Sequence, residues 1–329
     1  MIVLGSSGFI GQAVPEALAA LDQEAVVRTM VRSRPDSATQ PLNDVRIGDV
    51  RDLDSLRKAM AGADTVVHAA SYVGYDPELC RTTNVDGTTN VVAASAAAGV
   101  NRIVYLSTAS VYGSGPHRGP SEEEVVVAPS SPLSRSRADA EKIVLDAGGI
   151  VVRPDMVYGA GDRWFVPGFA RFVRALGGLV DGGSAKMSMI NVDDLAAVIS
   201  RLALAPQALN GPFHAAYTEP NTVSELTAAL SPVYEWKRTH ASVQRITALA
   251  SSAKAGFTER QFELLTTDHW YDVSALTTAI GADWGAGFGL SEADIDWYRS
   301  AAGLPARPLT TDRSNEGLPV AHAVRTFPR

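Results

Sequence analysis

The sequence predicts an α/β protein built on a doubly wound parallel sheet, and three observations support this fold class. A short apolar segment, Met1–Leu4, runs directly into glycines at Gly5, Gly8 and Gly11. Strand-like and helix-like segments then alternate, which is typical of βαβ units with right-handed crossovers. The chain has 329 residues, of which 46% are hydrophobic and 20% charged, and this is enough apolar sequence for a large core.

The opening segment predicts a strand, a tight turn and a helix. Gly5 tolerates a left-handed backbone, and glycines let backbone N–H groups approach a pyrophosphate. The N-terminus of the following helix would then direct its partial positive charge at that phosphate. The apolar face of this helix is expected to consist of Ile10, Val14, Ala17, Leu18 and Leu21. The spacing indicates a dinucleotide site, although an ordinary strand-turn-helix corner has the same local pattern.

A second predicted strand, Ala25–Val31, ends in Arg32, Ser33 and Arg34. A sheet of this kind that binds NAD usually carries an acidic residue near this point, which binds the adenosine 2′-hydroxyl. That residue is missing from the strand end, and guanidinium groups suit a 2′-phosphate. The sequence therefore predicts NADP(H) as the cofactor; the alternative is that both arginines are solvated surface residues.

Further elements follow in a regular order. The predicted strands are Val45–Asp52, Asp64–Ala70, Arg102–Thr108 and Gly211–Ala216. The predicted helices are Asp54–Met60, Asn84–Ala98 with Gly99 as its C-cap, Ser131–Glu141, Gly168–Leu176, and Thr222–Leu230 with Thr222 or Ser224 as its N-cap. Small residues at Ala69 and Ala70 leave room for a cofactor to cross the sheet edge.

Composition argues against several function classes. The net charge is −7 with no basic run, so a nucleic-acid partner is not expected. The single cysteine, Cys80, excludes an intrachain disulfide, and six scattered histidines give no expected metal site. No apolar run approaches the ~18–20 residues of a membrane helix. Because the first strand begins at Met1, no signal peptide is expected and the expected location is cytoplasmic. The oligomeric state is left open.

An ordered set of motifs resembles the extended short-chain dehydrogenase/reductase family. The matching segments are 5–11, 48–50, 68–70, 84–88, 106–113, 152–159 and 191–196, and the resemblance covers about residues 1–303. It implies a Rossmann domain over 1–163 plus about 187–216 and 268–280. It also implies a smaller, discontinuous C-terminal substrate domain over 164–186, 217–267 and 281–303, followed by an extended tail over 304–329.

The resemblance also implies cofactor contacts. The pyrophosphate would lie on Gly5, Ser7, Gly8, Phe9 and Ile10, and its path to the ribose on Ala69 and Ala70. The 2′-phosphate would lie on Arg32 with Ser33 or Arg34, and the adenine on Asp49 and Val50. The nicotinamide would lie near Ser107 and the segment from Pro154 to Val157, with Pro154, Met156 and Val157 as contacts.

The chain departs from the family at the acid–base pair. Members usually carry Tyr-x-x-x-Lys on the helix after the fifth strand, where tyrosine gives the proton and lysine lowers its pKa. Those positions hold Leu133 and Arg137, and none of the nine tyrosines has a lysine four residues later. Arg137 can still hold ribose hydroxyls. Thr108, with Ser107, is the candidate catalytic hydroxyl.

Three sources of the missing proton remain open. Another side chain can donate it, with Thr108, Ser110, Tyr112, Tyr72 and Ser134 as candidates. A water can donate it through Ser107 or Thr108. A phenolic hydroxyl beside the ketone can also assist from the substrate itself.

The third source leads to the function hypothesis. The chain resembles atypical members of the family that reduce aromatic polyketides of the angucyclinone type in antibiotic biosynthesis. An NADPH-dependent ketoreductase acting on a small aromatic ketone is therefore predicted; the alternative is a catalytically silent NADP-binding regulator or redox sensor. Two aromatic groups are expected to face either substrate or core: Trp164, Phe165, Phe169 and Phe172, and the run from Asp268 to Tyr271.

Overall fold

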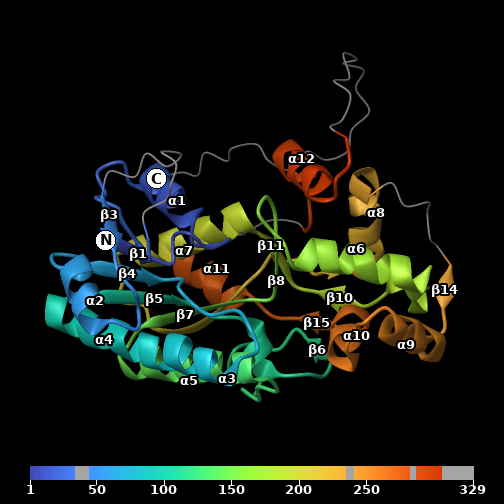
Figure 1. Ribbon diagram of the computed structural model, residues 1–329, viewed down its shortest axis with the longest axis horizontal. Helices are drawn as coiled ribbons and strands as arrows, with labels where there is room; N and C mark the ends of the chain where they lie inside the picture. The colour runs from blue at the N-terminus through green and yellow to red at the C-terminus, as the bar shows by residue number, and fades with distance from the viewer. Residues whose placement is uncertain (34–43, 235–240, 282–286, 306–329) are drawn as a thin grey trace, which may run out of the picture.

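A seven-stranded parallel sheet forms the centre of the protein in a computed structural model that describes residues 1–33, 44–234, 241–281 and 287–305 (Figure 1). Its strand order is β12-β7-β5-β4-β1-β2-β3. The strands are β1 (Ile2–Leu4), β2 (Arg28–Val31), β3 (Val45–Ile47), β4 (Thr65–His68), β5 (Arg102–Leu106), β7 (Ile150–Pro154) and β12 (Gly211–Ala215). The chain runs outwards from β1 to β3, returns to β4 on the other side of β1, and continues outwards to β12. This order confirms the predicted α/β fold with a doubly wound sheet, whose direction reverses between β1 and β4.

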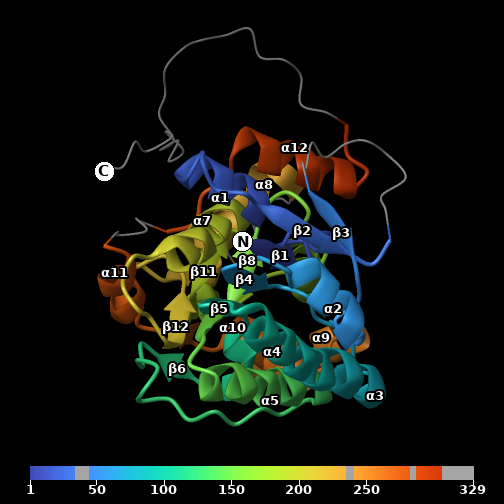
Figure 2. The ribbon, with the colours of Figure 1, turned by 90° about the vertical axis from the view of Figure 1, so that its left-hand side faces the viewer.

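Helices cover both faces of this sheet (Figure 2). Helices α1 (Val14–Leu21) and α7 (Val192–Leu204) pack together on one face. Helices α2 (Leu53–Met60), α4 (Gly87–Ala98) and α5 (Pro132–Asp146) cover the other. Successive residues of a strand point to opposite faces. Accordingly, Val3 is buried with Leu18 of α1, whereas Ile2 and Leu4 are buried with Leu56 of α2.

The rest of the described chain forms a smaller part beside the carboxyl ends of the central strands (Figure 1). Its strands are β6 (His117–Arg118), β8 (Met156–Tyr158), β9 (Leu179–Val180), β10 (Lys186–Met187), β11 (Met189–Asn191), β13 (Asn221–Thr222), β14 (Ser242–Val243) and β15 (His269–Trp270). Its helices are α6 (Phe165–Leu176), α8 (Val223–Tyr234), α9 (Arg245–Lys254), α10 (Glu259–Thr266) and α12 (Glu292–Ala301), with the single turn η3 (Asp181–Gly183). Helix α11 (Ser274–Ile280) instead packs against α7 and β12 of the central sheet. The short helix α3 (Pro77–Leu79) and the turn η2 (Ala109–Tyr112) lie elsewhere in the chain. A four-stranded sheet of order β13-β10-β15-β6 ties distant segments together, because β6 pairs in parallel with β15.

The first helix differs from its prediction. It begins at Val14, so Ile10 lies in the preceding turns, and Leu21 is 42% exposed and not on the buried face. Pro15 explains the late start, since proline lacks an N–H and is best accommodated in the first turn of a helix. The segment between β1 and α1 is therefore longer than predicted.

Other boundaries also shift. The second strand begins at Arg28 and not at Ala25, because only the last four residues of the predicted segment pair in the sheet. The third strand ends at Ile47 and not at Asp52, because only its first three residues pair with β2. A π-helical stretch, η1 (Cys80–Asp86), precedes α4, whereas an uninterrupted helix from Asn84 was predicted. The predicted C-cap is confirmed: Gly99 ends α4 in the left-handed conformation, with φ of +71°.

Thr222, and not Ser224, caps the N-terminus of α8, because the Thr222 Oγ1 accepts a hydrogen bond from the Glu225 N–H at 3.1 Å. The predicted tail lies outside the described residues from 306 onwards, and the division into two domains stays a prediction. Among the residues that the structure describes, no helix is long and apolar enough to cross a membrane.

Candidate functional site

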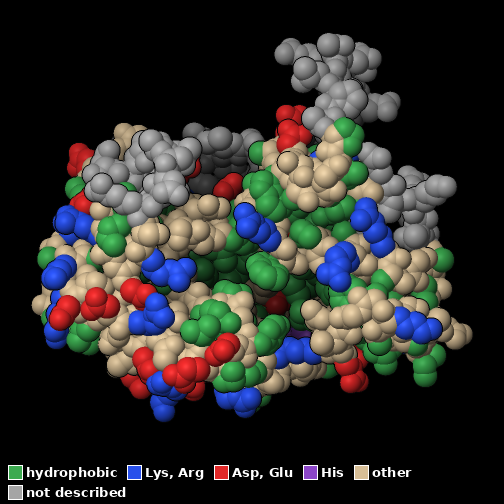
Figure 3. Space-filling model, viewed as in Figure 1, with side chains coloured by type: hydrophobic (Ala, Val, Ile, Leu, Met, Phe, Trp, Pro, Cys, Tyr) green, Lys and Arg blue, Asp and Glu red, His purple; other side chains and the backbone are tan. Residues whose placement is uncertain are grey.

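A cavity of about 370 Å³ lies where the smaller part meets the carboxyl ends of β5 and β7. This is the edge at which doubly wound sheets bind ligands, and the volume lies within the roughly 300–1,000 Å³ typical of small-molecule sites. The walls come from the segment after β5, the junction of β7 and β8, the start of α6, helix α10 and the end of β15. Its lining includes Thr108, Ser110, Asp155, Met156, Trp164, Arg260, Glu263, Leu264, His269 and Tyr271. In the space-filling view, the molecule is hollowed between its two parts, and hydrophobic side chains crowd the hollow (Figure 3).

The glycine loop sits at the reversal point of the sheet. Gly5 has φ of +81°, and a Cβ there would lie 2.5 Å from the backbone nitrogen of Ala70 at the end of β4. A Cβ on Gly11 would overlap the Gly5 carbonyl oxygen. Both positions therefore require glycine for the loop to pack against the end of β4. Ser7 and Gly8 are exposed, and Phe9 and Ile10 are half-buried, so the outer side of the loop remains accessible.

Residues expected at the adenosine end lie near one another. Arg32 and Ser33 follow β2 and are exposed, whereas Arg34 lies outside the described residues. Asp49 follows β3, and its carboxylate binds Arg51 at 2.6 Å, which lowers the Asp49 pKa; the Arg32 charge lowers it further. Within the described segments, Arg32 forms no ion pair of its own, so its guanidinium can take an anionic ligand. Val50 is buried, and its carbonyl accepts a hydrogen bond from Asn90 at 3.0 Å.

The two candidate hydroxyls have different surroundings. Ser107 is buried, donates to the Glu141 carboxylate, and is not part of the cavity lining. Thr108 lines the cavity, and its Oγ1 lies 3.2 Å from the Ser110 Oγ. The Thr108 side chain also accepts the Ser110 N–H at the start of a short 3₁₀ turn, Ala109–Tyr112. Of the two hydroxyls, only Thr108 is therefore placed to meet a molecule in the cavity.

Behind Ser107 lies a buried ion pair. Arg153 of β7 donates to the Glu141 carboxylate of α5 through both Nε and Nη2, with the shortest contact at 2.6 Å, and to the Tyr112 hydroxyl through Nη1 at 2.8 Å. The side chains of Arg153 and Glu141 are only 5% and 3% exposed. The Tyr112 hydroxyl also hydrogen-bonds to His214 at 2.5 Å, and burial raises the pKa of Tyr112 to about 12. Tyr112 is thus held in the protein interior rather than offered to the cavity.

Helix α5 carries Leu133 and Arg137. Leu133 is half-buried and has no proton to give. Arg137 is buried, donates to the Leu106 carbonyl at the end of β5, and lies over the Tyr105 ring at 5.2 Å. Its Nε has no hydrogen-bond partner among the described residues, so the guanidinium retains a donor. Burial and the Arg137 charge lower the pKa of His68 to about 3, and its Nε2 lies 3.0 Å from the Thr88 hydroxyl.

Sequence reasoning missed Asp155 as a functional group, although it lies within the segment expected near the nicotinamide. Pro154 and Met156 are buried and Val157 is half-buried, and of these three only Met156 lines the cavity. Asp155 lines it as well, and burial raises its pKa to about 8. The sequence feature that could have identified Asp155 is its position between two buried strands, where a carboxylate is poorly solvated and its pKa rises.

The aromatic residues divide between cavity and core. Trp164 is 76% exposed and lines the cavity, and Phe169 and Phe172 are buried in the main core. Trp164 is positioned by Asp162, whose buried carboxylate accepts hydrogen bonds from the N–H groups of the first turn of α6. Tyr271, like His269, lines the cavity from the end of β15.

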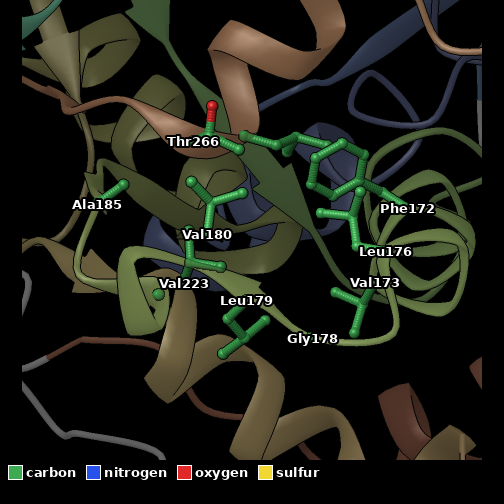
Figure 4. A pocket seen from close by; sticks show the side chains of 11 residues that line it. Phe172, Val173, Leu176, Gly178, Leu179, Val180, Ala185, Val223 and Thr266 are labelled. Atoms are coloured by element: carbon green, nitrogen blue, oxygen red, sulfur yellow. The ribbon is translucent and has the colours of Figure 1, made fainter. Parts of the chain in front are cut away.

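A second, small pocket between α6 and β9 does not compete as a site (Figure 4). Its volume is about 10 Å³, the space of roughly one water molecule. Its walls are apolar apart from the Thr266 hydroxyl. In the described part of the chain, no group of three or more His, Cys, Asp or Glu residues is placed to hold a metal ion.

Comparison with known proteins identifies relatives of the chain. Residues 1–215 match the model of the NAD dependent epimerase/dehydratase family. A 2-alkyl-3-oxoalkanoate reductase of Stenotrophomonas maltophilia is 30% identical over 307 residues, which cover 83% of this chain and 91% of the relative. A 4-hydroxy-2-methyl-3-oxo-4-farnesyl-3,4-dihydroquinoline-1-oxide ketoreductase of Stigmatella aurantiaca is 32% identical over 213 residues, which cover 58% of this chain and 60% of the relative.

Among solved structures, a short-chain dehydrogenase/reductase superfamily protein of Agrobacterium tumefaciens with bound NAD superposes with a TM-score of 0.69 at 20% identity. The match covers 92% of this chain and 95% of the other. This likeness shows the shared fold. The family itself is shown by the model match over residues 1–215 and by the relative that is 30% identical: the chain belongs to the NAD dependent epimerase/dehydratase family.

Proposed function

We propose that the protein is an NADPH-dependent ketoreductase that acts on a small aromatic ketone. The observation that carries the proposal is the cavity at the carboxyl ends of β5 and β7, which is lined by the Thr108 hydroxyl, the Asp155 carboxyl and the Trp164 ring. A ketone needs polar groups at its oxygen and apolar walls around its carbon skeleton, and this cavity offers both. Two relatives bear the names of a 3-oxoalkanoate reductase and a ketoreductase, which supports a ketone as substrate.

The chain offers the groups that a nicotinamide dinucleotide needs. The accessible glycine loop would hold the pyrophosphate, Ala69 and Ala70 leave space at the end of β4, and the guanidinium of Arg137 would hold the ribose hydroxyls. The bound cofactor supplies a hydride to the carbonyl carbon. The exposed Arg32 supports NADP over NAD, because a guanidinium can bind a 2′-phosphate and the acidic partner of a 2′-hydroxyl is missing from the end of β2.

Aromatic substrates are supported by the walls of the cavity. Trp164 and Tyr271 both line the cavity, from segments far apart in the chain, and aromatic rings pack favourably against one another. A ketone with a neighbouring phenolic hydroxyl, as in aromatic polyketide antibiotics of the angucyclinone type, fits this lining and the absence of a tyrosine at Leu133. We place the enzyme in the biosynthesis of such a compound. Thr108 would donate a hydrogen bond to the carbonyl oxygen and orient it.

The test is NADPH oxidation against matched ketones with and without a phenolic hydroxyl beside the carbonyl, with products identified by mass spectrometry. Alcohol formation coupled to NADPH consumption is the expected result, and Thr108→Val should lower kcat while leaving NADPH affinity unchanged. Tight NADPH binding without turnover of any ketone in the panel would instead support the alternative, a catalytically silent NADP-binding regulator or redox sensor.

A further inference from the structure

Asp155 is an ionisable group in the cavity that makes no ion pair within the described chain. It stands at the carboxyl end of β7, between two strands, and lines the cavity together with Thr108, Ser110 and Tyr271. Its Oδ2 is shielded from solvent and has no hydrogen-bond partner among the described residues. A shielded carboxylate oxygen without a partner is costly to ionise, so this oxygen favours the protonated carboxyl, while the residue itself lines a ligand-sized cavity.

The charged groups around Asp155 do not neutralise it. Arg153, two residues earlier, is committed to Glu141 and Tyr112. Arg260 of α10 lines the cavity as well, but it donates to the Ser130 hydroxyl at 2.5 Å and forms no ion pair with Asp155 within the described residues. Glu263 of α10 is itself acidic, and its carboxylate accepts a hydrogen bond from Arg245.

From β15 and the residue that follows it, His269 and Tyr271 face the same cavity, and burial lowers the pKa of His269, so it stays neutral at pH 7. Burial alone raises the Asp155 pKa to about 8, so at neutral pH the carboxyl keeps its proton. A protonated carboxyl is a hydrogen-bond donor as well as an acceptor. General acids work best when their pKa lies near the operating pH, and Asp155 meets that condition.

The neighbouring hydroxyls are less suited to this role. Burial raises the pKa of Tyr271, which makes its phenol a weaker acid than usual. Tyr112 is held by Arg153 and His214 and does not line the cavity. Thr108 has an alcohol hydroxyl, which can orient a carbonyl oxygen but is a far weaker acid than a carboxyl.

We propose that Asp155 is the catalytic acid that protonates the carbonyl oxygen, replacing the tyrosine that the family usually provides. The assignment rests on the proposed ketone reduction. The carbonyl carbon gains a C–H bond from the hydride of the reduced nicotinamide, and the electron pair of the C=O π bond moves to oxygen. That oxygen takes the Asp155 proton, and the O–H electron pair stays on the carboxylate. The ketone is reduced to an alcohol, the cofactor is oxidised, and the carboxylate recovers a proton from water that enters the cavity.

The experiment compares wild type with Asp155→Asn, which keeps the shape of the side chain and removes the acid, and with Asp139→Asn on the exposed face of α5 as a matched control. We expect Asp155→Asn to lower kcat by about 10²–10⁴-fold, the usual contribution of general acid catalysis. KM and NADPH affinity should change less than about threefold. The wild-type kcat/KM should fall above about pH 8, and Asp155→Asn should lack that fall.

A second readout does not need turnover. Infrared difference spectra between wild type and Asp155→Asn, recorded on the cofactor-free protein, should show a carboxylic acid C=O band at pH 7 that disappears as the pH rises through about 8. An ionised carboxyl at pH 7 would overturn the assignment. If the wild type turns over a ketone and Asp155→Asn does so with the same kcat, the assignment is overturned as well. The proton would then come from water or from the substrate hydroxyl. No wild-type turnover with any ketone would instead overturn the proposed function and, with it, this assignment.

Discussion

Replacing Arg153 by methionine should be among the most damaging single changes in the core. The Arg153 side chain is 5% exposed, and its guanidinium donates to the Glu141 carboxylate through Nε and Nη2 and to the Tyr112 hydroxyl through Nη1. Methionine fills most of the volume but leaves the Glu141 carboxylate buried with only the Ser107 hydroxyl as partner. Removing one member of a buried ion pair costs about 3–5 kcal/mol, because the remaining charge is neither paired nor solvated. We expect Arg153→Met to lower the free energy of unfolding by that amount.

The double variant Arg153→Met, Glu141→Leu provides the decisive comparison. It removes both charges, so no uncompensated carboxylate remains, and it should be more stable than Arg153→Met alone. Asp54→Ala serves as a surface control, because the Arg57–Asp54 pair is 54% and 78% exposed and such pairs are worth at most about 1 kcal/mol. Urea unfolding, followed by circular dichroism and tryptophan fluorescence, measures all three. The reasoning fails if Arg153→Met lies within about 1 kcal/mol of wild type, or if the double variant is no more stable than the single one.

Three other predictions concern the histidine, the glycine loop and the cofactor. Burial lowers the folded-state pKa of His68 to about 3, whereas its unfolded pKa is about 6.5. The stability that neutral His68 contributes is therefore fully present above the unfolded pKa and is lost as the pH falls. In urea unfolding, roughly 2 kcal/mol of the unfolding free energy should disappear between pH 7.5 and 5, and His68→Gln should show a flatter dependence on pH. Gly11→Ala should weaken NADPH binding more than tenfold in a fluorescence titration, because the added Cβ would overlap the Gly5 carbonyl. Gly168→Ala is the control: a Cβ there meets no atom within 4 Å, so NADPH binding should stay unchanged. Equal effects of the two substitutions would refute the steric argument. Arg32→Ala should weaken NADPH binding about 10–100-fold, because a charge-assisted hydrogen bond to the 2′-phosphate is lost, and should leave NADH binding unaltered. An equal loss of affinity for both cofactors would exclude a contact between Arg32 and the 2′-phosphate.

Local chemistry explains what could be predicted from the sequence. Gly5 and Gly99 both adopt the left-handed backbone that their patterns indicate, because a turn and a helix C-cap depend on a few neighbouring residues. The parallel, doubly wound sheet follows from the alternation of strands and helices, whereas the order of the strands is seen only in the structure. The start of the first helix was wrong because Pro15 outweighs the apolar spacing that begins at Ile10. The π-helical stretch Cys80–Asp86 has no local pattern that distinguishes it from an ordinary helix.

The cavity wall was harder to predict because its parts come from distant segments. The sequence pattern left open whether Tyr271 faces core or substrate, and only the pairing of β15 with β6 and β10 orients it. These strands have two residues each, too few for a periodic signal. Asp155 was within the segment expected near the nicotinamide, but its elevated pKa depends on its surroundings in the folded chain and not on its neighbours in sequence.

The pairing of β6 with β15 has a consequence for how the protein is made. Arg118 and Asp268 form an ion pair at 2.7 Å across this junction, yet they are 150 residues apart in the chain. At a synthesis rate of about 5–20 residues per second, the partner strand emerges from the ribosome roughly 8–30 s after β6. During that interval the glycine loop and its neighbouring strands can already form, while the inner wall of the cavity has no cover. The nascent chain can therefore form its glycine loop well before β15 supplies its wall of the cavity.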